Sequence, residues 1–162
     1  MKSIKEIYRI GRGPSSSHTM GPEAAAKMFI GEFPSAERYE AVLYGSLAKT
    51  GKGHGTDRVL RETFAPRALD IKLELTATDI PHPNTLDFTA FDKNGNVIGK
   101  RRVLSIGGGA IEVEGRKDAE PPEVYPFENF AQIKEYCKKE SIRIPDLVER
   151  FEGVEIWQYL DR

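Results

Sequence analysis

The sequence predicts an α+β fold, in which a mixed and partly antiparallel sheet packs against helices. The first observation is the pair Asn94-Gly95, which is typical of a hairpin turn and lies between strand-like segments at 86–92 and 97–106. The second is the alternation of apolar and polar residues from Ile71 to Leu75, which is the period of a half-buried strand. Helical spacing of apolar residues elsewhere in the chain adds about five helices to this sheet.

The remaining elements follow from local patterns. Proline at position 22, followed by strong helix formers, predicts a helix that begins directly after a polar loop. Further helices are expected at 3–10 and 57–64, and strands at 38–44 and 110–114.

Two amphipathic helices are expected near the C-terminus. The first has Phe127, Phe130, Ile133 and Cys137 on one face, and the second is marked by Ile144, Leu147, Val148 and Phe151. Cys137 is most simply a packing residue of its face. We therefore predict one domain over residues 1–120, and a helical segment over 121–162 that packs on this domain or on a partner.

Composition narrows the class of protein. The chain has 162 residues, with 24 Lys and Arg against 25 Asp and Glu, so no strong field draws it to nucleic acid or anionic lipid. One cysteine excludes an internal disulfide. No apolar run approaches the roughly 20 residues that span a bilayer, and the first residues do not resemble a secretory signal. A cytoplasmic location is expected.

All three histidines, His18, His54 and His82, fall in segments rich in Gly, Pro, Ser, Thr or Asn. Residues that bind or react are often mounted on loops over a rigid scaffold, whereas a core histidine more often lies in an apolar periodic segment. These three segments are therefore the candidate functional loops.

The first of them, residues 13–22, carries the run Ser15, Ser16, Ser17, His18 and Thr19 at a predicted helix start. Four hydroxyl groups, an imidazole and free backbone N–H groups suit a carboxylate or a phosphate. A capping turn that binds no ligand remains the alternative.

The second segment, residues 51–57, is expected to be a glycine-rich loop that offers Lys52 and His54 to a ligand. It is not a Walker P-loop, because the order of its lysine and threonine is wrong. The third segment adds His82 and Asn84 on a proline-stiffened loop. For both segments, a plain turn is the alternative.

Two other site types are disfavoured. A zinc site would need the three histidines to converge, and the usual His-x-x-x-His spacing is absent. A serine hydrolase would need a Gly-x-Ser-x-Gly nucleophile elbow, which the serine-rich segment does not match.

Residues 13–22 resemble the signature of the bacterial iron–sulfur L-serine dehydratases, in particular their β domain or β subunit. Three further segments are similar to that family in the same order: residues 49–57, residues 82–84 and residues 105–109. The resemblance covers residues 1 to about 115.

The resemblance implies an L-serine ammonia-lyase component that helps convert L-serine to pyruvate and ammonia. The [4Fe–4S] cluster would be held by a partner α part and not by this chain, and one cysteine agrees with that expectation. We expect His54 to be the residue of this chain that lies closest to the reacting atoms. We also expect the protein to form a homo- or hetero-oligomer. The expected substrate-binding residues are Ser15, Ser16, Ser17, His18, Thr19, Lys52, His82 and Asn84.

The resemblance also implies a fold like the allosteric substrate-binding domain of some phosphoglycerate dehydrogenases. This supports an alternative function, a non-catalytic regulatory domain that binds serine or another small anion. No pattern after Gly115 suggests an ACT-type domain. Residues 126–162 instead resemble the segment that leads from β into α in fused members of the family.

Overall fold

The computed structural model describes residues 1–117 and 121–161, and its chain divides into two compact units, Gly11–Asp118 and Met1–Ile10 with Ala119–Arg162. The predicted domain boundary at residue 120 falls on residues 118–120, which lie outside the described part of the chain. Each unit has its own buried cluster of apolar side chains. Among the described residues, no helix has the length and apolar character needed to cross a membrane.

The larger unit contains the predicted mixed sheet, which confirms the α+β class. Its five strands are β1 (Arg38–Tyr44), β2 (Ala68–Glu74), β3 (Thr85–Phe91), β4 (Val97–Gly107) and β5 (Ala110–Val113). They lie in the order β2-β1-β3-β4-β5, with β1 and β2 parallel and the other neighbours antiparallel. As predicted, β3 and β4 form a hairpin, and Gly95 has the positive φ of 83° that its turn requires.

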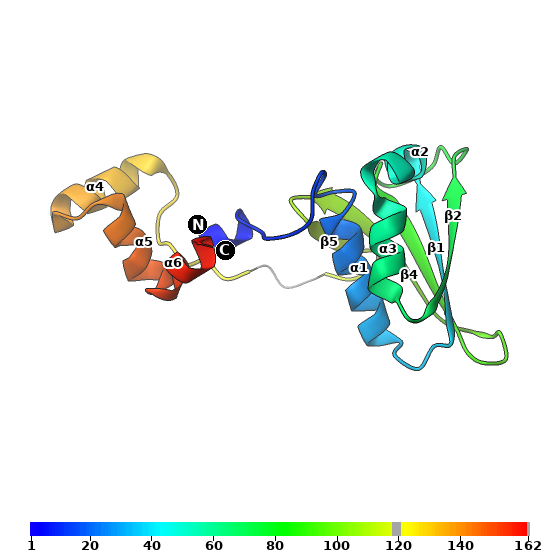
Figure 1. Ribbon diagram of the computed structural model, residues 1–162. Coiled ribbons are helices and arrows are strands. Elements are labelled where there is room, and N and C mark those ends of the chain that lie inside the picture. Colours follow the sequence, from blue (N-terminus) through cyan, green and yellow to red (C-terminus); the bar gives the residue numbers. More distant parts are fainter. Residues whose placement is uncertain (118–120, 162) are drawn as a thin grey trace. The chain divides into compact units, whose positions relative to one another are not determined.

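Three helices belong to this unit: α1 (Met20–Glu32), α2 (Gly45–His54) and α3 (Thr56–Phe64). In Figure 1, α1 and α3 lie beside each other over one face of the sheet. Helices α2 and α3 form the crossover that two parallel neighbouring strands need, and they join β1 to β2.

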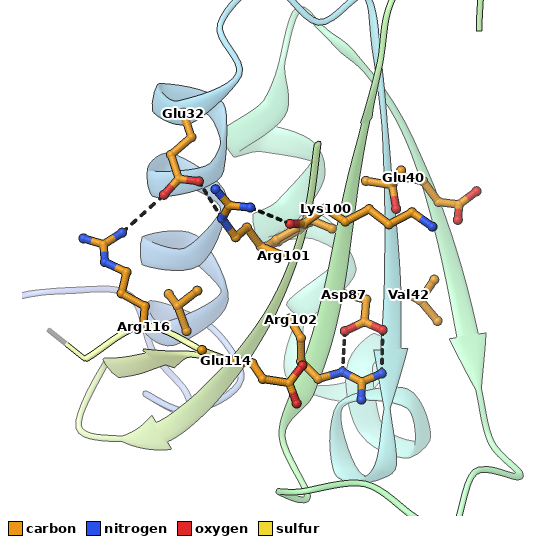
Figure 2. Close-up of a pocket in the computed structure, with 13 residues that line it drawn as sticks. Glu32, Glu40, Val42, Asp87, Lys100, Arg101, Arg102, Glu114 and Arg116 are labelled. Atoms are coloured by element: carbon orange, nitrogen blue, oxygen red, sulfur yellow. Dashed lines mark hydrogen bonds and ion pairs between the residues drawn. The ribbon is translucent and has the colours of Figure 1, made fainter. Parts of the chain in front are cut away.

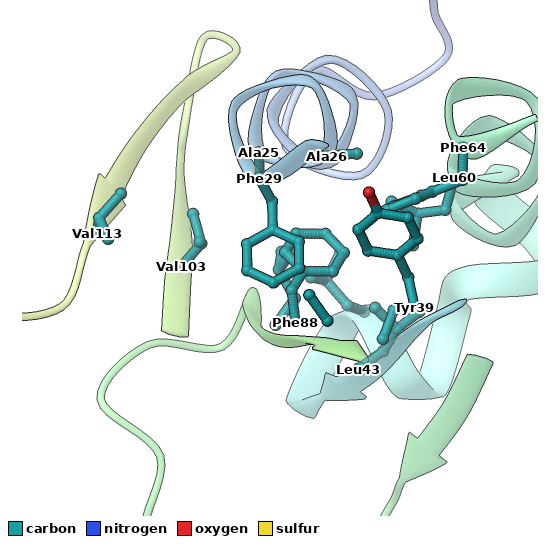
Figure 3. Packing of buried hydrophobic residues seen from close by; sticks show 14 of the residues in the cluster. Ala25, Ala26, Phe29, Tyr39, Leu43, Leu60, Phe64, Phe88, Val103 and Val113 are labelled. Atoms are coloured by element: carbon teal, nitrogen blue, oxygen red, sulfur yellow. The ribbon is translucent and has the colours of Figure 1, made fainter. Parts of the chain in front are cut away.

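The core lies between these helices and the sheet. Strand β1 buries alternate residues, among them Tyr39 and Leu43, because successive side chains of a strand point to opposite faces. Phe29 of α1 stacks on Phe88 of β3 with ring centroids 5.3 Å apart, and Tyr39 packs on Phe64 of α3 at 4.9 Å (Figure 3). This aromatic layer fixes α1 and α3 on the sheet.

The smaller unit is helical, with α4 (Phe130–Glu140), α5 (Ile144–Glu152), α6 (Glu155–Leu160) and the short 3₁₀ helix η1 (Ile4–Glu6). Tyr125, Phe127 and Leu147 form its buried cluster, and Ile156 of α6 is buried as well. The Glu152 carboxylate accepts hydrogen bonds from the Ser3 hydroxyl (2.7 Å) and the Tyr125 hydroxyl (2.9 Å), which join η1 to the end of α5.

Three sequence predictions about local structure are wrong. The helix expected at 3–10 is only the 3₁₀ turn Ile4–Glu6: Ile4 packs on the small cluster, but Ile7, Tyr8 and Ile10 are exposed, so burial does not stabilise a longer helix. Residues 51–54 are the last turn of α2 and not a loop. Phe127 is buried but precedes α4, whereas Phe130, which is inside α4, is 65% exposed. Cys137 does pack in the small cluster, as predicted.

Candidate functional site

His18 stands at the centre of a polar cluster within the larger unit. It lies in the loop before α1, is 7% exposed, and its Nδ1 atom is 3.1 Å from the hydroxyl oxygens of both Ser15 and Ser17. Its Nε2 atom is 3.1 Å from the Ser46 hydroxyl in the first turn of α2. Hydroxyl groups can donate or accept, so they satisfy both ring nitrogens and fix the orientation of the ring.

His54, the last residue of α2, packs on the His18 ring in an edge-to-face arrangement. The two ring centroids are 4.7 Å apart and the ring planes are at 84°. The Nδ1 atom of His54 is buried and has no hydrogen-bond partner in the described part of the chain. This nitrogen is therefore free to accept or donate a hydrogen bond to a ligand.

Two buried threonines hold the serine-rich loop in place. The Thr19 hydroxyl donates to the carbonyl oxygens of Arg12 (2.6 Å) and Ser15 (2.7 Å). The Thr56 hydroxyl, at the start of α3, donates to the carbonyl of His18 at 2.7 Å. The loop is thus fixed from within and from α3, which gives His18 a single position.

The backbone of this loop also uses N–H groups that the sequence analysis expected to be free. Those of His18 and Thr19 donate to the carbonyl of Ser15, and that of Gly21 donates to the carbonyl of Ser16 at 2.9 Å. The loop folds as a turn ahead of α1, so hydroxyl groups, more than backbone N–H groups, are what it can offer to a ligand.

The His82–Asn84 loop is joined to the same cluster. The N–H of Ser46 donates to the carbonyl of Pro83 at 2.7 Å, so one residue of α2 contacts both this loop and His18. Within the loop, the N–H of Asn84 donates to Nδ1 of His82 at 3.0 Å, and the Thr85 hydroxyl donates to the carbonyl of His82 at 2.6 Å.

Asn84 connects the cluster to β4. The N–H of Ser105 donates to the carbonyl of Asn84 at 2.9 Å, and the Asn84 side-chain amide donates to the carbonyl of Ser105 at 3.4 Å. Asn84 Oδ1 and Ser105 Oγ are buried without a partner among the described residues. Leaving a buried polar atom unpaired costs about 1–3 kcal/mol, so we expect water or a ligand to satisfy them.

The close approach of α1 to β4 depends on a small residue. A side chain added at Gly21 would place its Cβ 2.0 Å from the Ser105 hydroxyl oxygen. Glycine therefore lets the start of α1, and with it the serine-rich loop, lie directly against the strand that carries Ser105.

Burial sets the charge of the central imidazole. The pKa of His18 is lowered from its usual value of 6.5, chiefly because burial disfavours the charged ring and secondarily because His54 lies beside it. His18 is thus neutral near pH 7, which suits a ring that hydrogen-bonds to hydroxyl groups.

The same shift predicts an acid sensitivity of the fold. Because the unfolded chain binds the His18 proton more tightly, the free energy of unfolding should fall as the pH drops below about 6.5 and level off below the lowered folded pKa. Carboxylates with shifted pKa values titrate below this window. Urea unfolding at pH 7.5 and 5.5 should show a smaller loss for His18→Gln than for the wild type. Equal losses in the two proteins would contradict the prediction.

The structure thus brings His18, His54, His82 and Asn84 into one connected cluster, although they come from three separate sequence segments. Lys52 is not joined to it by any recorded contact within the described residues. Lys52 and His54 are two residues apart in α2, so their side chains are separated by about 200° around the helix axis. Lys52 lines instead a small pocket of about 80 Å³ with Asp57 and Arg61.

The sequence analysis did not name three members of the cluster as site residues: Ser46, Thr56 and Ser105. Thr56 and Ser105 lie in the segments 51–57 and 105–109 that it singled out, whereas Ser46 lies outside every such segment. A local signal for Ser46 was available, because a small polar residue shortly after a strand commonly lies at a helix start.

A larger pocket, of about 780 Å³, lies on the sheet face that the helices leave uncovered (Figure 2). Most of its charges pair across strands or with α1. Arg102 binds both oxygens of Asp87 (2.7 and 2.8 Å), and Arg101 pairs with Glu32 at 2.8 Å. The arrangement is that of a solvated sheet face, and none of the predicted site residues lines it.

Within residues 1–117 and 121–161, no three His, Cys, Asp or Glu side chains lie together in a way that could hold an ion, and Cys137 is a free thiol in the other unit.

The comparison with known proteins bears directly on this cluster. The family profile described as "Serine dehydratase beta chain" matches residues 3–64, the part of the chain that contains the serine-rich loop, Ser46 and His54. Proteins named L-serine dehydratase match most of the chain at about 30% identity. Over residues 3–64, the chain is therefore similar to the serine dehydratase beta chain family.

Three relatives of this chain illustrate how much of each sequence is matched. L-serine dehydratase of Mycobacterium bovis is 30% identical over 93% of this chain and 42% of its own length. L-serine dehydratase 2 of Escherichia coli K12 is 30% identical over 94% of this chain and 43% of its own length. L-serine dehydratase of Haemophilus influenzae is 29% identical over 89% of this chain and 42% of its own length. The chain thus spans less than half the length of these relatives.

Proposed function

We propose that this chain is the β part of an L-serine dehydratase, which converts L-serine to pyruvate and ammonia together with an iron–sulfur α part. One observation carries the proposal: a buried, unpartnered Nδ1 atom of His54 lies beside the fixed serine-rich loop, inside the segment that matches the family. The names of the relatives support the choice of L-serine as substrate.

In this proposal, His54 is the catalytic residue of the chain. The reaction removes the α-proton and the β-hydroxyl group of serine, and the resulting aminoacrylate tautomerises and hydrolyses to pyruvate and ammonia. An imidazole with a ring nitrogen that makes no other hydrogen bond can take up or relay the α-proton, or orient the substrate by a hydrogen bond. His18 keeps the His54 ring in place through their edge-to-face contact.

The substrate carboxylate would lie at the serine-rich loop. Hydroxyl groups of Ser15, Ser16 and Ser17 can donate to carboxylate oxygens, and Thr19 and His18 keep the loop in shape. Asn84 offers an amide oxygen that has no partner among the described residues. His82 and Lys52 are weaker candidates, because the first already accepts the N–H of Asn84 and the second lies apart from the cluster.

The iron–sulfur cluster would be held by the α part. A single cysteine cannot supply the thiolates that a [4Fe–4S] cluster needs, so the donor set of this chain does not fit that group. We therefore also propose an oligomer with the α part and a cytoplasmic location, where thiols stay reduced.

Reconstitution tests this function. The chain is mixed with a cysteine-rich α part and treated anaerobically with iron and sulfide, and pyruvate formation from L-serine is measured. We expect turnover only when both parts and iron are present. Turnover by this chain alone, without iron, would show that the proposal is wrong.

A further inference from the structure

The small unit carries an apolar groove that its own core does not fill. The groove has a volume of about 250 Å³ and lies between α4 and α5, with the half-buried side chains of Ile133, Cys137 and Ile142 in its floor. At its rim, Phe130 is 65% exposed and Ile144 is 50% exposed. Two large apolar residues flanking one concave apolar surface are a pattern found at protein–protein contacts.

Two unpaired cations border the same groove. Lys134 and Lys138 are four residues apart, so they project from one side of α4. Both are exposed and neither makes a hydrogen bond or ion pair within the described residues, whereas the nearby Arg143 is paired with Asp146 at 3.4 Å. The groove is thus apolar in its floor and positive along one edge.

We propose that this groove binds an acidic, amphipathic segment of the serine dehydratase α part, an inference that rests on the proposed function. The volume suits one or two large apolar side chains, and Lys134 and Lys138 would pair with carboxylates beside them. Such a rim of charge steers association and selects the partner, while the buried apolar contact supplies most of the affinity.

The relatives support this choice of partner. The match to L-serine dehydratase 2 of Escherichia coli covers 94% of the chain, and 6% of 162 residues is about ten residues, so the matched stretch includes all of α4 and reaches into α5. In that relative, the equivalents of these helices share a polypeptide with a further 57% of sequence that has no counterpart in this chain. The groove is exposed in this chain, whereas the Escherichia coli relative has additional sequence that could cover the equivalent surface.

Affinity measurements with the full chain test the groove. We expect Phe130→Asp to raise the Kd for the α part by about 10- to 100-fold, because a carboxylate would then face an apolar contact. The double variant with Lys134→Glu and Lys138→Glu should raise it by about 10-fold at low salt, and its affinity should no longer fall as NaCl is added.

Two control variants change the same kinds of residue outside the groove. Val154→Asp places a charge at another exposed apolar residue of the small unit, and Lys93→Glu reverses an exposed lysine in the β3–β4 turn. Both should bind the α part with the affinity of the wild type. Circular dichroism and thermal unfolding should show that all four proteins are folded.

The outcomes separate the two proposals. If the wild type binds the α part and turns over serine, but the groove variants bind equally well, the groove proposal is wrong and the proposed function stands. If the wild type neither binds the α part nor supports turnover, both are wrong. Weaker binding by the groove variants alone supports the groove as the docking surface.

Discussion

Replacement of His54 by glutamine is expected to lower the kcat of the reconstituted enzyme for L-serine by about 10²- to 10⁴-fold, the usual contribution of a positioned acid or base. Glutamine keeps much of the volume and the helix propensity, but it cannot carry a proton at the place of Nδ1. The measurement is steady-state pyruvate formation together with the affinity for the α part, which should not change.

His82→Gln is the matched control for this variant. The Nδ1 atom of His82 already accepts the N–H of Asn84, so that ring has less left to offer a substrate, and we expect less than about a 10-fold effect. If His54→Gln leaves turnover intact but changes the activation by serine at a remote site, the catalytic role is wrong and a regulatory role is favoured.

Gly45→Ala should destabilise the larger unit by about 2–4 kcal/mol. Gly45 has φ of +51°, and an added Cβ would lie 2.5 Å from the carbonyl oxygen of Pro83. That oxygen accepts the N–H of Ser46, so the clash would separate α2 from the His82–Asn84 loop. Urea unfolding measures the stability, and the kcat of the assembled enzyme should fall as well.

Gly53→Ala, in the same helix, is the matched control. A Cβ there would meet no atom within 4 Å, and the backbone needs no positive φ. Alanine in a helix interior should therefore stabilise the unit by roughly 0.5–1 kcal/mol. A Gly45→Ala protein as stable as the wild type would show that the close approach of Gly45 to Pro83 does not persist in solution.

The sheet could be predicted from sequence because its signals are local. Asn94-Gly95 specifies a hairpin turn, and the strands on either side are joined by backbone hydrogen bonds in the register that the turn allows. Gly21-Pro22 marked the start of α1 for a similar reason, since proline suits the first turn of a helix.

Helix α2 was missed because its stability is not local. With glycines at 45, 51 and 53, its sequence has low helix propensity and indicates a loop. The helix forms because Leu47, Ala48 and Gly51 pack into the core, and such packing commonly outweighs propensity. The consequence for the site is direct: His54 is mounted on a helix end and not on a flexible loop.

The site was predictable only as separate segments. Histidines beside glycine, proline and serine indicated where a ligand could bind, but no sequence signal gave the distance between them. Ser46 and Ser105 are single small residues whose roles depend on which segments the sheet brings together. Their partners are 28 and 21 residues away along the chain, at His18 and Asn84.

Ser105 lies near the end of β4, and its backbone completes the hydrogen bonds that hold Asn84 in place. The binding cluster therefore cannot close on a growing polypeptide until about two thirds of the chain has left the ribosome. Any hairpin or helix pair released earlier lacks one side of the cluster. Under the proposed function, a nascent chain should therefore not retain serine before Ser105 has joined the sheet. Binding of the proposed substrate would then report that the first four strands of the larger unit have assembled.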